Sequence, residues 1–421
     1  MRDDAQMTQQ VTVVGAGVVG LSTAWFLQER GVDVTVIDRT GIAAGASWGN
    51  AGWLMAGDVT PLPSPETFRD GLRGLTSRRS SLKIPLRGSP ERYWFLLQLA
   101  RSCTRRRWET SLAALQPLAA RALQAYDALT SSGVEATTTP SGHHLAAFTS
   151  IAERDDYARH LEHLKASGGD TEFVVMDRHQ AQEASPVLSD AVVGAIGLLG
   201  QRYIDPTRFV PALADAVSRR GGRIAVGETV RAVRDSGSYV ELLVKDHRSS
   251  RILRSDTVVL CTGAQLPELA RPFGARVRLH AGRGYSFSVG TGVEVTDAVY
   301  LPSAHLAATP WQGRLRVAGT MEFAPADAPL ERARVEAMRA SLRPLVRNVD
   351  LDDVQDQWVG ARPVTADGRP LAGRTTSPRV WVVGGHAMEG MVLGPATAQL
   401  IAEAIVDGRV PPMLSPFDPL R

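Results

Sequence analysis

One run near the start of the chain, VTVVGAGVVG at Val11–Gly20, constrains the fold more than any other. It reads as a buried apolar strand that opens at once into a turn containing Gly15, Gly17 and Gly20. A helical pattern, LSTAWFLQERG, comes next, and a second apolar strand, VDVTVID, ends at Asp38. In such a unit the turn amides and the helix N-terminus meet a pyrophosphate, and the acid accepts from a ribose hydroxyl. We therefore predict a dinucleotide-binding unit whose Asp38 disfavours a 2′-phosphate; a tight turn without a ligand is the alternative.

A second glycine loop, GGHAMEGMVLGP, lies between an apolar strand and a long helical pattern near the C-terminus. Four glycines there allow the backbone to approach a ligand closely: Gly384, Gly385, Gly390 and Gly394. The following helix would direct its positive N-terminal end at that ligand, which suits the pyrimidine edge of a flavin that becomes anionic on reduction. FAD spans the distance between two such sites and NAD usually does not, so we expect FAD. A plain strand–helix connector is the alternative.

Patterns of the nucleotide-binding type recur in the middle of the chain, so the domain that they form is discontinuous. In YIDPTRFVPALADAVSRRGG, Asp205 is a good N-cap and Pro206 suits the first helical position. We predict an α/β fold, α+β overall, with a Rossmann-like FAD-binding domain and a substrate domain built on a mixed, antiparallel sheet. The predicted boundaries are 8–60, 200–275 and 355–412 for the FAD-binding domain, and 61–199 and 276–354 for the substrate domain.

The segments between these units give weaker patterns. The proline-rich stretch 61–107 is expected to form loops and short helices. Helical patterns cover Leu112–Leu129 and Ala152–Lys165, and alternating patterns predict strands at His144–Phe148 and Ala191–Leu199.

Charge and cysteine usage exclude several classes of protein. The 47 basic and 44 acidic residues give a net charge of only +3, far from the excess of a dedicated nucleic-acid binder. The two cysteines, Cys103 and Cys261, stand in no CxxC or Cys/His cluster, so we expect neither a disulfide framework nor a metal site. The start of the chain does not resemble a signal peptide, and no apolar run is long enough for a membrane span. We expect a cytoplasmic protein.

One segment leaves contact with the inner face of the cell membrane open. The aromatic, apolar run YWFLLQLA lies between the basic runs Arg78-Arg79 and Arg105-Arg106-Arg107. Such a segment could rest on an anionic lipid surface, as would suit a dehydrogenase that passes electrons to quinones. The favoured alternative is a core helix with solvated arginines. The same basic runs could in principle bind RNA, but the sequence contains no recognisable RNA-binding module.

Several motifs together make the chain similar to a known superfamily. They occur in the order GxGxxG at Gly15–Gly20, GASWGNAG, RYIDPTRFV, VVLCTGA, GRGYSF, RVAGTMEF, WVGARPVTADGRPLAG and GGHAMEGM. In this order the chain resembles the D-amino acid oxidase-like flavoproteins, most of all bacterial D-amino acid dehydrogenases and glycine/glyphosate-oxidase-like enzymes. The resemblance spans nearly the whole chain and implies a glutathione-reductase-type FAD domain. It implies FAD contacts at Gly15, Gly17, Val18, Gly20, Asp38, Arg39, Ser47, Asn50, Ala51, Gly52, Val230, Thr262, Gly263, Gly385, His386, Gly390 and Met391.

The resemblance also implies candidate catalytic residues. Arg362 stands where the family's GLRP-type motif carries an Arg near the substrate, and its planar guanidinium suits an α-carboxylate. His386, in the last glycine loop, could donate to the flavin or to a substrate oxygen. Tyr285, in GRGYSF, could supply a hydroxyl at the mouth of the site. The structural alternatives are a brace between domains for Arg362, a turn-shaping histidine and a half-buried strand tyrosine.

The expected reaction is removal of hydride from a carbon bearing an amine. Hydride passes to flavin N5, and the resulting imine hydrolyses to a keto acid and ammonia. A D-amino acid is the favoured substrate, with oxygen or a quinone as the electron acceptor. The alternatives are an N-alkyl glycine (sarcosine, glycine or glyphosate-type) oxidase, an FAD-binding subunit of a hetero-oligomeric amine dehydrogenase, and an RNA-modifying flavoprotein. The oligomeric state is not predicted, and no nucleic-acid partner is expected.

The stretch GASWGNAGW bears on how FAD is held. In relatives it runs beside the pyrophosphate and ribityl chain, where small residues avoid collision and Ser47 and Asn50 can form hydrogen bonds. Some relatives attach the flavin covalently through a His in a TWHAAG-like pattern, and aligning Trp48 with that Trp places Gly49 at the His position. Neither cysteine lies in Gln357–Leu371, near where sarcosine-oxidase-like relatives attach flavin. Non-covalent FAD is therefore expected.

Overall fold

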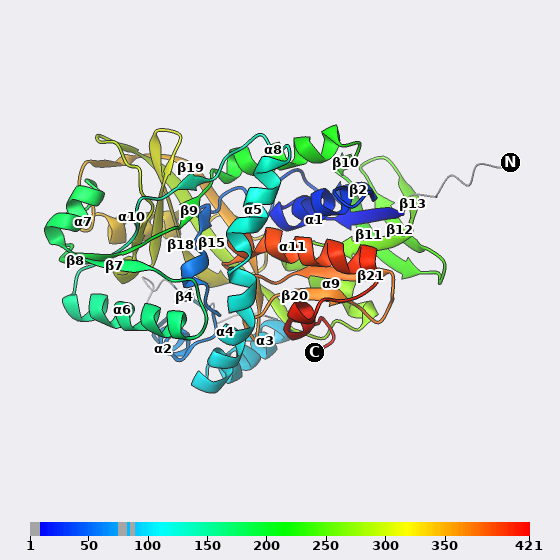
Figure 1. Ribbon diagram of the computed structural model, residues 1–421, viewed down its shortest axis with the longest axis horizontal. Helices are drawn as coiled ribbons and strands as arrows, with labels where there is room; N and C mark the ends of the chain where they lie inside the picture. The colour runs from blue at the N-terminus through cyan, green and yellow to red at the C-terminus, as the bar shows by residue number, and fades with distance from the viewer. Residues whose placement is uncertain (1–8, 75–81, 85–88) are drawn as a thin grey trace.

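The computed structural model describes residues 9–74, 82–84 and 89–421. Two large β-sheets organise this part of the chain, a six-stranded sheet on the right of Figure 1 and a nine-stranded sheet on the left. Helices from several parts of the chain pack between and around them. The mixed α/β architecture that the sequence predicts is confirmed.

The six-stranded sheet has the order expected of a nucleotide-binding domain, β10-β2-β1-β14-β21-β20. Its first five strands are parallel, and β20 pairs antiparallel with β21 at one edge. Parallel strands buried on both faces read as continuous apolar runs, which explains VTVV, VVL and VWVV in the sequence. The strands are β1 (Gln10–Val14), β2 (Asp33–Asp38), β10 (Arg223–Val226), β14 (Thr257–Leu260), β20 (Leu371–Arg374) and β21 (Val380–Gly384).

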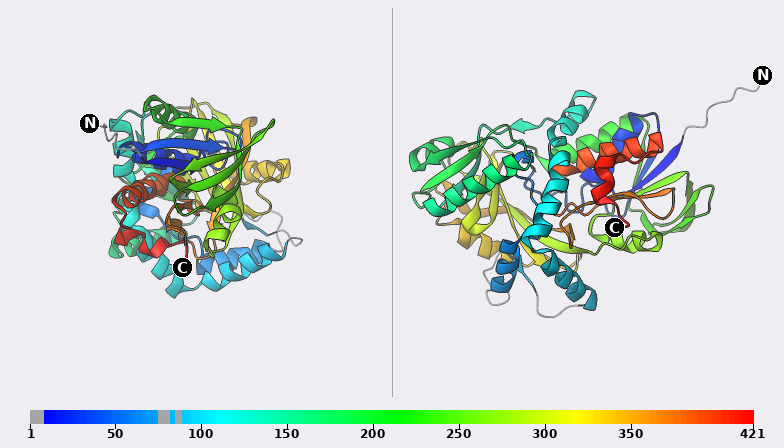
Figure 2. Two further views of the ribbon diagram at one scale, coloured as in Figure 1. Left: turned by 90° about the vertical axis from the view of Figure 1, so that its right-hand side faces the viewer. Right: turned by 60° about the horizontal axis from the view of Figure 1, so that its bottom comes forward.

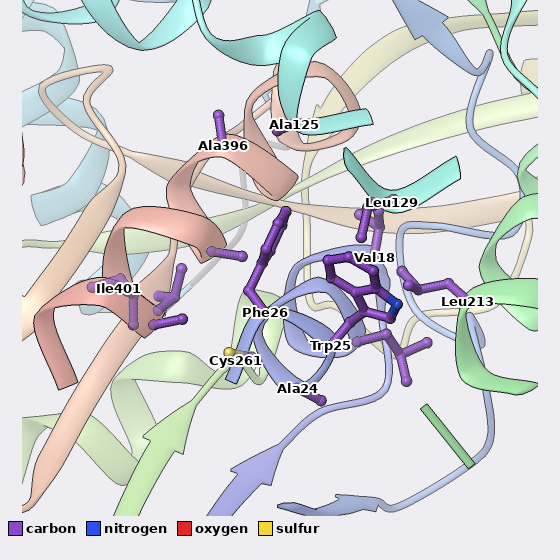
Figure 3. Close-up of a cluster of buried hydrophobic side chains, with 14 of the residues drawn as sticks. Val18, Ala24, Trp25, Phe26, Ala125, Leu129, Leu213, Cys261, Ala396 and Ile401 are labelled. Carbon is purple, nitrogen blue, oxygen red and sulfur yellow. The ribbon is translucent and has the colours of Figure 1, made fainter. Parts of the chain in front are cut away.

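Helix α1 (Val18–Gln28) follows the first glycine turn and is buried on nearly every side. Its Trp25 and Phe26 lie among side chains of three other helices, with Leu129 and Leu213 on one side and Ile401 on the other (Figure 3). Those helices are α5 (Ala122–Ser131), α8 (Pro206–Arg219) and α11 (Gly390–Asp407). This core fixes the N-terminus of α1 at the carboxyl edge of the sheet.

Helix termini agree with the sequence signals. The Asp205 side chain caps α8 by accepting from the Thr207 N–H at 2.9 Å, and Pro206 occupies the first helical position. Helix α11 ends at Gly408, whose φ of 67° is the left-handed conformation that glycine tolerates best. The strand predicted in RIAVGETVRAV is two strands, because the backbone turns at Gly227, with φ 77°, between β10 and the strand β11 (Thr229–Asp235).

Short elements complete the nucleotide-binding half. An antiparallel sheet follows β10, with strands β11 (Thr229–Asp235), β12 (Val240–Lys245) and β13 (Ser250–Ser255). Beyond β14 come η2 (Gly263–Gln265), α9 (Leu266–Ala270) and η3 (Arg271–Phe273), and the chain ends after η5 (Pro412–Phe417).

The nine-stranded sheet runs in the order β19-β15-β18-β17-β16-β6-β8-β7, with β4 paired to β18. Most neighbours pair antiparallel, but β16 with β6 and β4 with β18 are parallel, so the sheet is mixed as predicted. Its strands are β4 (Leu82–Lys83), β6 (His144–Phe148), β7 (Phe173–Asp177), β8 (Gly194–Leu198), β15 (Leu279–Thr291), β16 (Val299–Leu301), β17 (Leu306–Trp311), β18 (Arg314–Phe323) and β19 (Val349–Thr365). Beside it lie α6 (Ile151–Ala166), α7 (Arg178–Ala184), α10 (Arg332–Leu342) and η4 (Pro302–Ala304).

A three-stranded sheet joins segments from three regions of the chain. Its strands are β3 (Trp53–Leu54), β9 (Arg202–Tyr203) and β5 (Thr139–Pro140). The short helix η1 (Ala56–Asp58) follows β3 directly.

The predicted stretch of loops and short helices contains two ordered helices, α2 (Pro65–Gly74) and α3 (Pro90–Ser102). Figure 2 shows both, in blue, on the same side of the molecule. The single helix predicted over Leu112–Leu129 is two helices, α4 (Arg105–Ala119) and α5. Pro117 near the end of α4 has no backbone N–H for the helical ladder, and α4 stops two residues later.

The predicted division into domains remains our proposal. The six-stranded sheet takes every strand from the segments assigned to the FAD-binding domain. The nine-stranded sheet takes its strands from the substrate segments, except that β19 runs across the boundary at residue 355. Helices α4 and α5 belong to a predicted substrate segment, yet their buried residues share one core with α1 and α11. In the described part of the chain, no helix is long and apolar enough to cross a membrane.

Candidate active site

A first cavity of about 370 Å³ lies at the carboxyl edge of the six-stranded sheet, beside the N-terminus of α1. Most of the residues predicted to contact FAD line it. They are Gly15, Gly17, Val18, Asp38, Arg39, Ser47, Asn50, Val230, Thr262, Gly263, His386, Gly390 and Met391. Four predicted contacts lie outside this lining: Gly20, Ala51, Gly52 and Gly385. The cavity therefore joins both glycine loops of the sequence in one place.

The glycine turn is packed against neighbouring backbone. A Cβ on Gly15, whose φ is 116°, would lie 2.4 Å from the Cys261 carbonyl oxygen of the adjacent strand end. A Cβ on Gly20 would lie 1.9 Å from the Gly15 carbonyl oxygen. Gly20 is thus required for the approach of α1 to the turn, which explains why it lies outside the cavity lining.

Asp38 is held by three backbone donors. Its Oδ2 accepts from the Ala16 N–H at 2.9 Å, and its Oδ1 accepts from the N–H groups of Thr40 at 2.8 Å and Gly41 at 3.0 Å. A carboxylate offers about four acceptor positions, so one remains for a ribose hydroxyl. Asp38 thereby fixes the loop after β2 and still faces the cavity.

The GASWGNAG stretch is held by its own hydrogen bonds. Ser47 Oγ accepts from the Val18 N–H at 3.1 Å, at the start of α1. Asn50 Oδ1 accepts from the Gly52 N–H at 2.8 Å, and Ser286 Oγ donates to the Gly49 carbonyl at 2.8 Å. The two polar residues that the sequence assigns to FAD therefore also anchor the loop itself.

Gly49 is small because a tryptophan occupies the adjoining space. A Cβ on Gly49 would lie 2.0 Å from Cδ2 of Trp358, and a Cβ on Gly360 would lie 1.9 Å from Cη2 of the same ring. The Trp358 indole thus fits over two glycine backbones, one on the loop and one on β19. No pattern in the sequence predicts the contact between these two motifs.

The residues of the first cavity fit FAD. The two glycine turns leave room for backbone to approach a pyrophosphate, and the N-termini of α1 and α11 supply partial positive charge. Thr262 Oγ1 is buried at this cavity and has no hydrogen-bond partner among the described residues. A bound group with hydrogen-bonding oxygens or nitrogens would satisfy it.

A second cavity, of about 450 Å³, opens toward the nine-stranded sheet. Three residues line both cavities, Ala46, Asn50 and Arg362, so the two spaces meet there. The second cavity runs from this junction between α2, β18 and the start of α11. A substrate in it can reach a flavin in the first cavity only at the junction.

Arg362 presents an unpaired guanidinium at the junction. Its Nη1 donates to the Thr320 carbonyl at 2.7 Å, and no carboxylate among the described residues pairs with it. Burial lowers its pKa to about 10, so it stays cationic near neutral pH. Thr320 adopts φ 62°, unusual for a β-branched residue, and its Oγ1 is buried without a partner among the described residues. The Arg362 guanidinium and the Thr320 hydroxyl are both hydrogen-bond donors that an anion in the second cavity could use.

His386 lines the first cavity as a neutral group. Its Nε2 lies 3.1 Å from Thr397 Oγ1, and that hydroxyl donates to the Leu393 carbonyl at 2.8 Å. The hydroxyl proton is therefore used, which assigns the proton of the ring to Nε2 and leaves Nδ1 an acceptor. Burial lowers the pKa of His386 to about 4. The sequence suggests that His386 could donate to the flavin or to a substrate oxygen; with the ring proton on Nε2, that donation would require breaking the bond to Thr397.

Tyr285 lines neither cavity. The ring is fully buried in the core of the nine-stranded sheet, and its hydroxyl donates to Glu322 Oε2 at 2.9 Å. Glu322 also pairs with Arg283 at 3.2 Å. The tyrosine belongs to a buried network with Glu322 and Arg283, which favours the structural alternative over a role at the mouth of the site.

Sequence reasoning missed four residues of the second cavity: Asp58, Thr320, Trp358 and Glu389. Trp358 and Glu389 stand inside quoted motifs, four residues before Arg362 and three after His386. Their closeness in sequence to Arg362 and His386 could have indicated that they belong to the same site. Thr320 also stands inside a quoted motif, RVAGTMEF. Asp58 carries no local signal, because only the tertiary fold brings η1 to the same space as β18.

The chain is similar to known proteins in both sequence and structure. A family model described as FAD dependent oxidoreductase matches residues 10–404. A D-amino acid dehydrogenase of Cereibacter sphaeroides is 29% identical over 414 residues, covering 96% of this chain and 92% of the relative. Glycine oxidase from Geobacillus kaustophilus has a similar structure, with a TM-score of 0.74 at 22% identity, covering 98% of this chain and 99% of that one. Iminodiacetate oxidase from Chelativorans sp. BNC1 gives a TM-score of 0.71 at 19% identity, with 97% and 98% covered. The resemblance and the cofactor expected from the sequence are confirmed.

The packing of the glycine turn predicts that Gly20→Ala weakens FAD retention. The added methyl would meet the Gly15 carbonyl oxygen, and overpacking of this kind costs about 1–3 kcal/mol, or roughly ten- to a hundredfold in affinity. FAD retention is measured as the ratio of flavin absorbance to protein concentration after gel filtration. Gly292→Ala is the control, because its methyl would meet only the Asn348 carbonyl oxygen at 3.8 Å. Equal flavin content in the two variants would contradict the assignment.

Proposed function

The chain belongs to the family of FAD-dependent oxidoreductases, and we propose that it oxidises the C–N bond of a D-amino acid. The substrate loses a hydride from the α-carbon and a proton from the amine, and the imine product hydrolyses to a keto acid and ammonia. The observation that carries this proposal is the unpaired Arg362 guanidinium where the two cavities meet.

Substrate anchoring follows from the donors at the junction. The guanidinium of Arg362 has about five N–H donors and spends one on Thr320, which leaves a planar pair for a carboxylate. Thr320 lines the second cavity with Arg362, and its hydroxyl, which has no partner among the described residues, can donate to the same carboxylate. Both groups lose water on folding, so an incoming carboxylate is stabilised more than it would be at the surface.

The remaining task of the chain is to position the α-carbon. FAD, when bound, supplies the hydride acceptor at its N5 atom. Trp358, held against Gly49 and Gly360, forms a rigid wall of the second cavity and restricts the substrate to few orientations. His386 faces the first cavity as a neutral imidazole, so it adds no positive charge that would repel a protonated amine.

The choice of a D-amino acid rests on the relatives and on cavity size. The curated relative in the comparison is a D-amino acid dehydrogenase, whereas the structures are named glycine oxidase and iminodiacetate oxidase. An N-alkyl glycine therefore stands as the second candidate substrate. A cavity of about 450 Å³ lies in the range of pockets for ligands much larger than glycine, which favours an amino acid with a side chain.

We further propose a cytoplasmic location in which α3 contacts an anionic membrane surface, with a quinone as acceptor; oxygen is the alternative. Three apolar side chains of α3 are exposed: Tyr93 by 46%, Trp94 by 51% and Leu97 by 43%. Arg101 lies near the C-terminus of α3, and α4 begins with the basic run at 105–107. The other basic run, Arg78-Arg79, lies outside the described residues. Exposed aromatic residues flanked by cations are typical of helices at lipid headgroups.

Anaerobic flavin reduction tests the reaction and the role of Arg362. The holoenzyme should lose its visible flavin band with D-amino acids and keep it with their L-enantiomers and with sarcosine. Arg362→Ala should retain FAD but raise the apparent Kd for the amino acid about thirtyfold or more, because a buried charge pair is lost. An unchanged apparent Kd would remove Arg362 from substrate binding. A flavin that no amine bleaches would favour a non-catalytic FAD subunit.

The environment of Gly49 predicts that FAD is held without a covalent bond. Residue 49 has no side chain to attach the flavin, and Cys103 lines neither cavity. Cys261 lines the first cavity at the end of β14, beside the glycine turn, and not the junction where the flavin ring would meet substrate. Acid precipitation should therefore leave the flavin in the supernatant, as measured by its absorbance. Flavin that stays in the washed pellet would show a covalent link.

The exposed face of α3 predicts binding to anionic vesicles. A double variant, Trp94→Ser with Leu97→Ser, should reduce co-sedimentation with phosphatidylglycerol vesicles several-fold. Ile151→Ser on α6 is the matched control, because that side chain is also exposed, by 46%, but lies on a different helix. Equal sedimentation of both variants and the parent protein would contradict the membrane contact.

A further inference from the structure

The second cavity carries an excess of acidic side chains. Four carboxylates line it, Asp58, Glu66, Asp70 and Glu389. Among the described residues that line it, the basic groups are the Arg362 guanidinium and the His305 imidazole. A cavity for a neutral amino acid needs one cation for the α-carboxylate and gains nothing from four acids, so the acidic wall requires an explanation.

Two of the four carboxylates, those of Glu66 and Asp70, lie close to basic side chains. Glu66 pairs with Arg69 at 2.8 Å one turn along α2, and both side chains are mostly exposed. Asp70 Oδ2 lies 3.9 Å from the His305 Nε2. These carboxylates form the outer rim of the cavity.

Glu389 has no such partner. It stands at the N-cap of α11, where its backbone N–H donates to the His386 carbonyl, while its side chain lines the second cavity. No hydrogen-bond donor or basic side chain among the described residues reaches its carboxylate. Burial, reinforced by Asp58, raises its pKa to about 8.

Asp58 faces the same space from the opposite element. Its Oδ2 accepts from the Tyr157 hydroxyl at 2.5 Å, and its Oδ1 lies 3.5 Å from His160 Nε2. Its negative charge acts on both Glu389 and Tyr300. Burial, reinforced by Asp58 and Asp70, raises the pKa of Tyr300 to about 12. Two neighbouring carboxylates in a desolvated cavity repel each other, and a cation placed between them would relieve that repulsion.

We propose that the second cavity selects substrates with a cationic side chain, a guanidinium or an ammonium group, which Glu389 and Asp58 bind. The inference rests on the proposed oxidation of a D-amino acid and deepens it. Arg362 at the junction holds the α-carboxylate, so the α-carbon faces the first cavity. The side chain then extends along the second cavity toward the acids. Tyr300 also lines this cavity, and aromatic rings attract guanidinium groups.

The substrate pair D-arginine and D-citrulline tests the proposal, because the two side chains have nearly the same shape and only arginine is charged. Rapid-mixing flavin reduction under anaerobic conditions gives the apparent Kd separately from the reduction rate constant. The holoenzyme should bind D-arginine about ten- to a hundredfold more tightly than D-citrulline, as expected for a charged hydrogen-bonded contact. Glu389→Gln should abolish most of that preference while leaving the Kd for D-citrulline within a few-fold.

Two further variants make the outcome decisive. Asp58→Asn should also reduce the preference for D-arginine. This variant tests the proposal if Glu389→Gln does not fold. Glu403→Gln is the matched control on the same helix, since Glu403 pairs with Arg30 at the surface, 3.4 Å away, and lies outside both cavities. The control should keep the full preference.

The possible failures are distinguishable. Equal affinity for D-arginine and D-citrulline in the parent enzyme overturns the inference and leaves the proposed oxidation intact. An equal loss for both substrates in Glu389→Gln assigns Glu389 to the α-ammonium group instead, which also overturns it. A flavin that neither these two compounds nor any other D-amino acid reduces refutes the proposed function itself.

Discussion

The close approach of the first glycine turn to its neighbours is the contact on which the rest of the structure depends. Gly15 lies against the Cys261 carbonyl at the end of β14, and Gly20 lies against Gly15. Only glycine allows strand, turn and helix to meet at these distances. The approach sets the position of α1, and α1 is the centre of the core shared by α5, α8 and α11. The first cavity and the start of α11, with Glu389, are placed as a consequence.

The parts of the site that local sequence predicts are those made of local backbone. The glycine turn, the Asp205 cap and the last loop before α11 each depend on residues within one short segment. Tyr285 illustrates the limit, because its alternating strand pattern cannot say which side of the sheet it faces. The contact of Trp358 with Gly49 joins residues far apart in the chain, and no periodicity records such a pair. The acidic wall was missed for the same reason, since its members come from η1, α2 and α11.

Two buried guanidiniums show how environment separates structure from function. Arg316 is fully buried between the rings of Trp48 and Trp311, with centroid distances of 5.0 and 4.6 Å, and its Nη2 donates to Ser286 Oγ. It supports the loop around Gly49 through the Ser286 bond to the Gly49 carbonyl and lines neither cavity. Arg362 lines both cavities and stacks on no aromatic ring in the described part of the chain, so its donors remain available to an anion. Burial lowers the pKa of both to about 10, and position alone gives them different roles.

The seating of Trp358 over Gly49 also restricts how this protein can evolve. A histidine at residue 49, the first step toward a covalent flavin, would drive its side chain into the indole. The indole cannot simply move toward β19, because Gly360 already lies against its far edge. A covalent descendant would therefore have to change residue 358 before or together with residue 49. Packing thus fixes the order of these substitutions. The non-covalent state depends on residues 49 and 358 together, and not on the absence of a histidine alone.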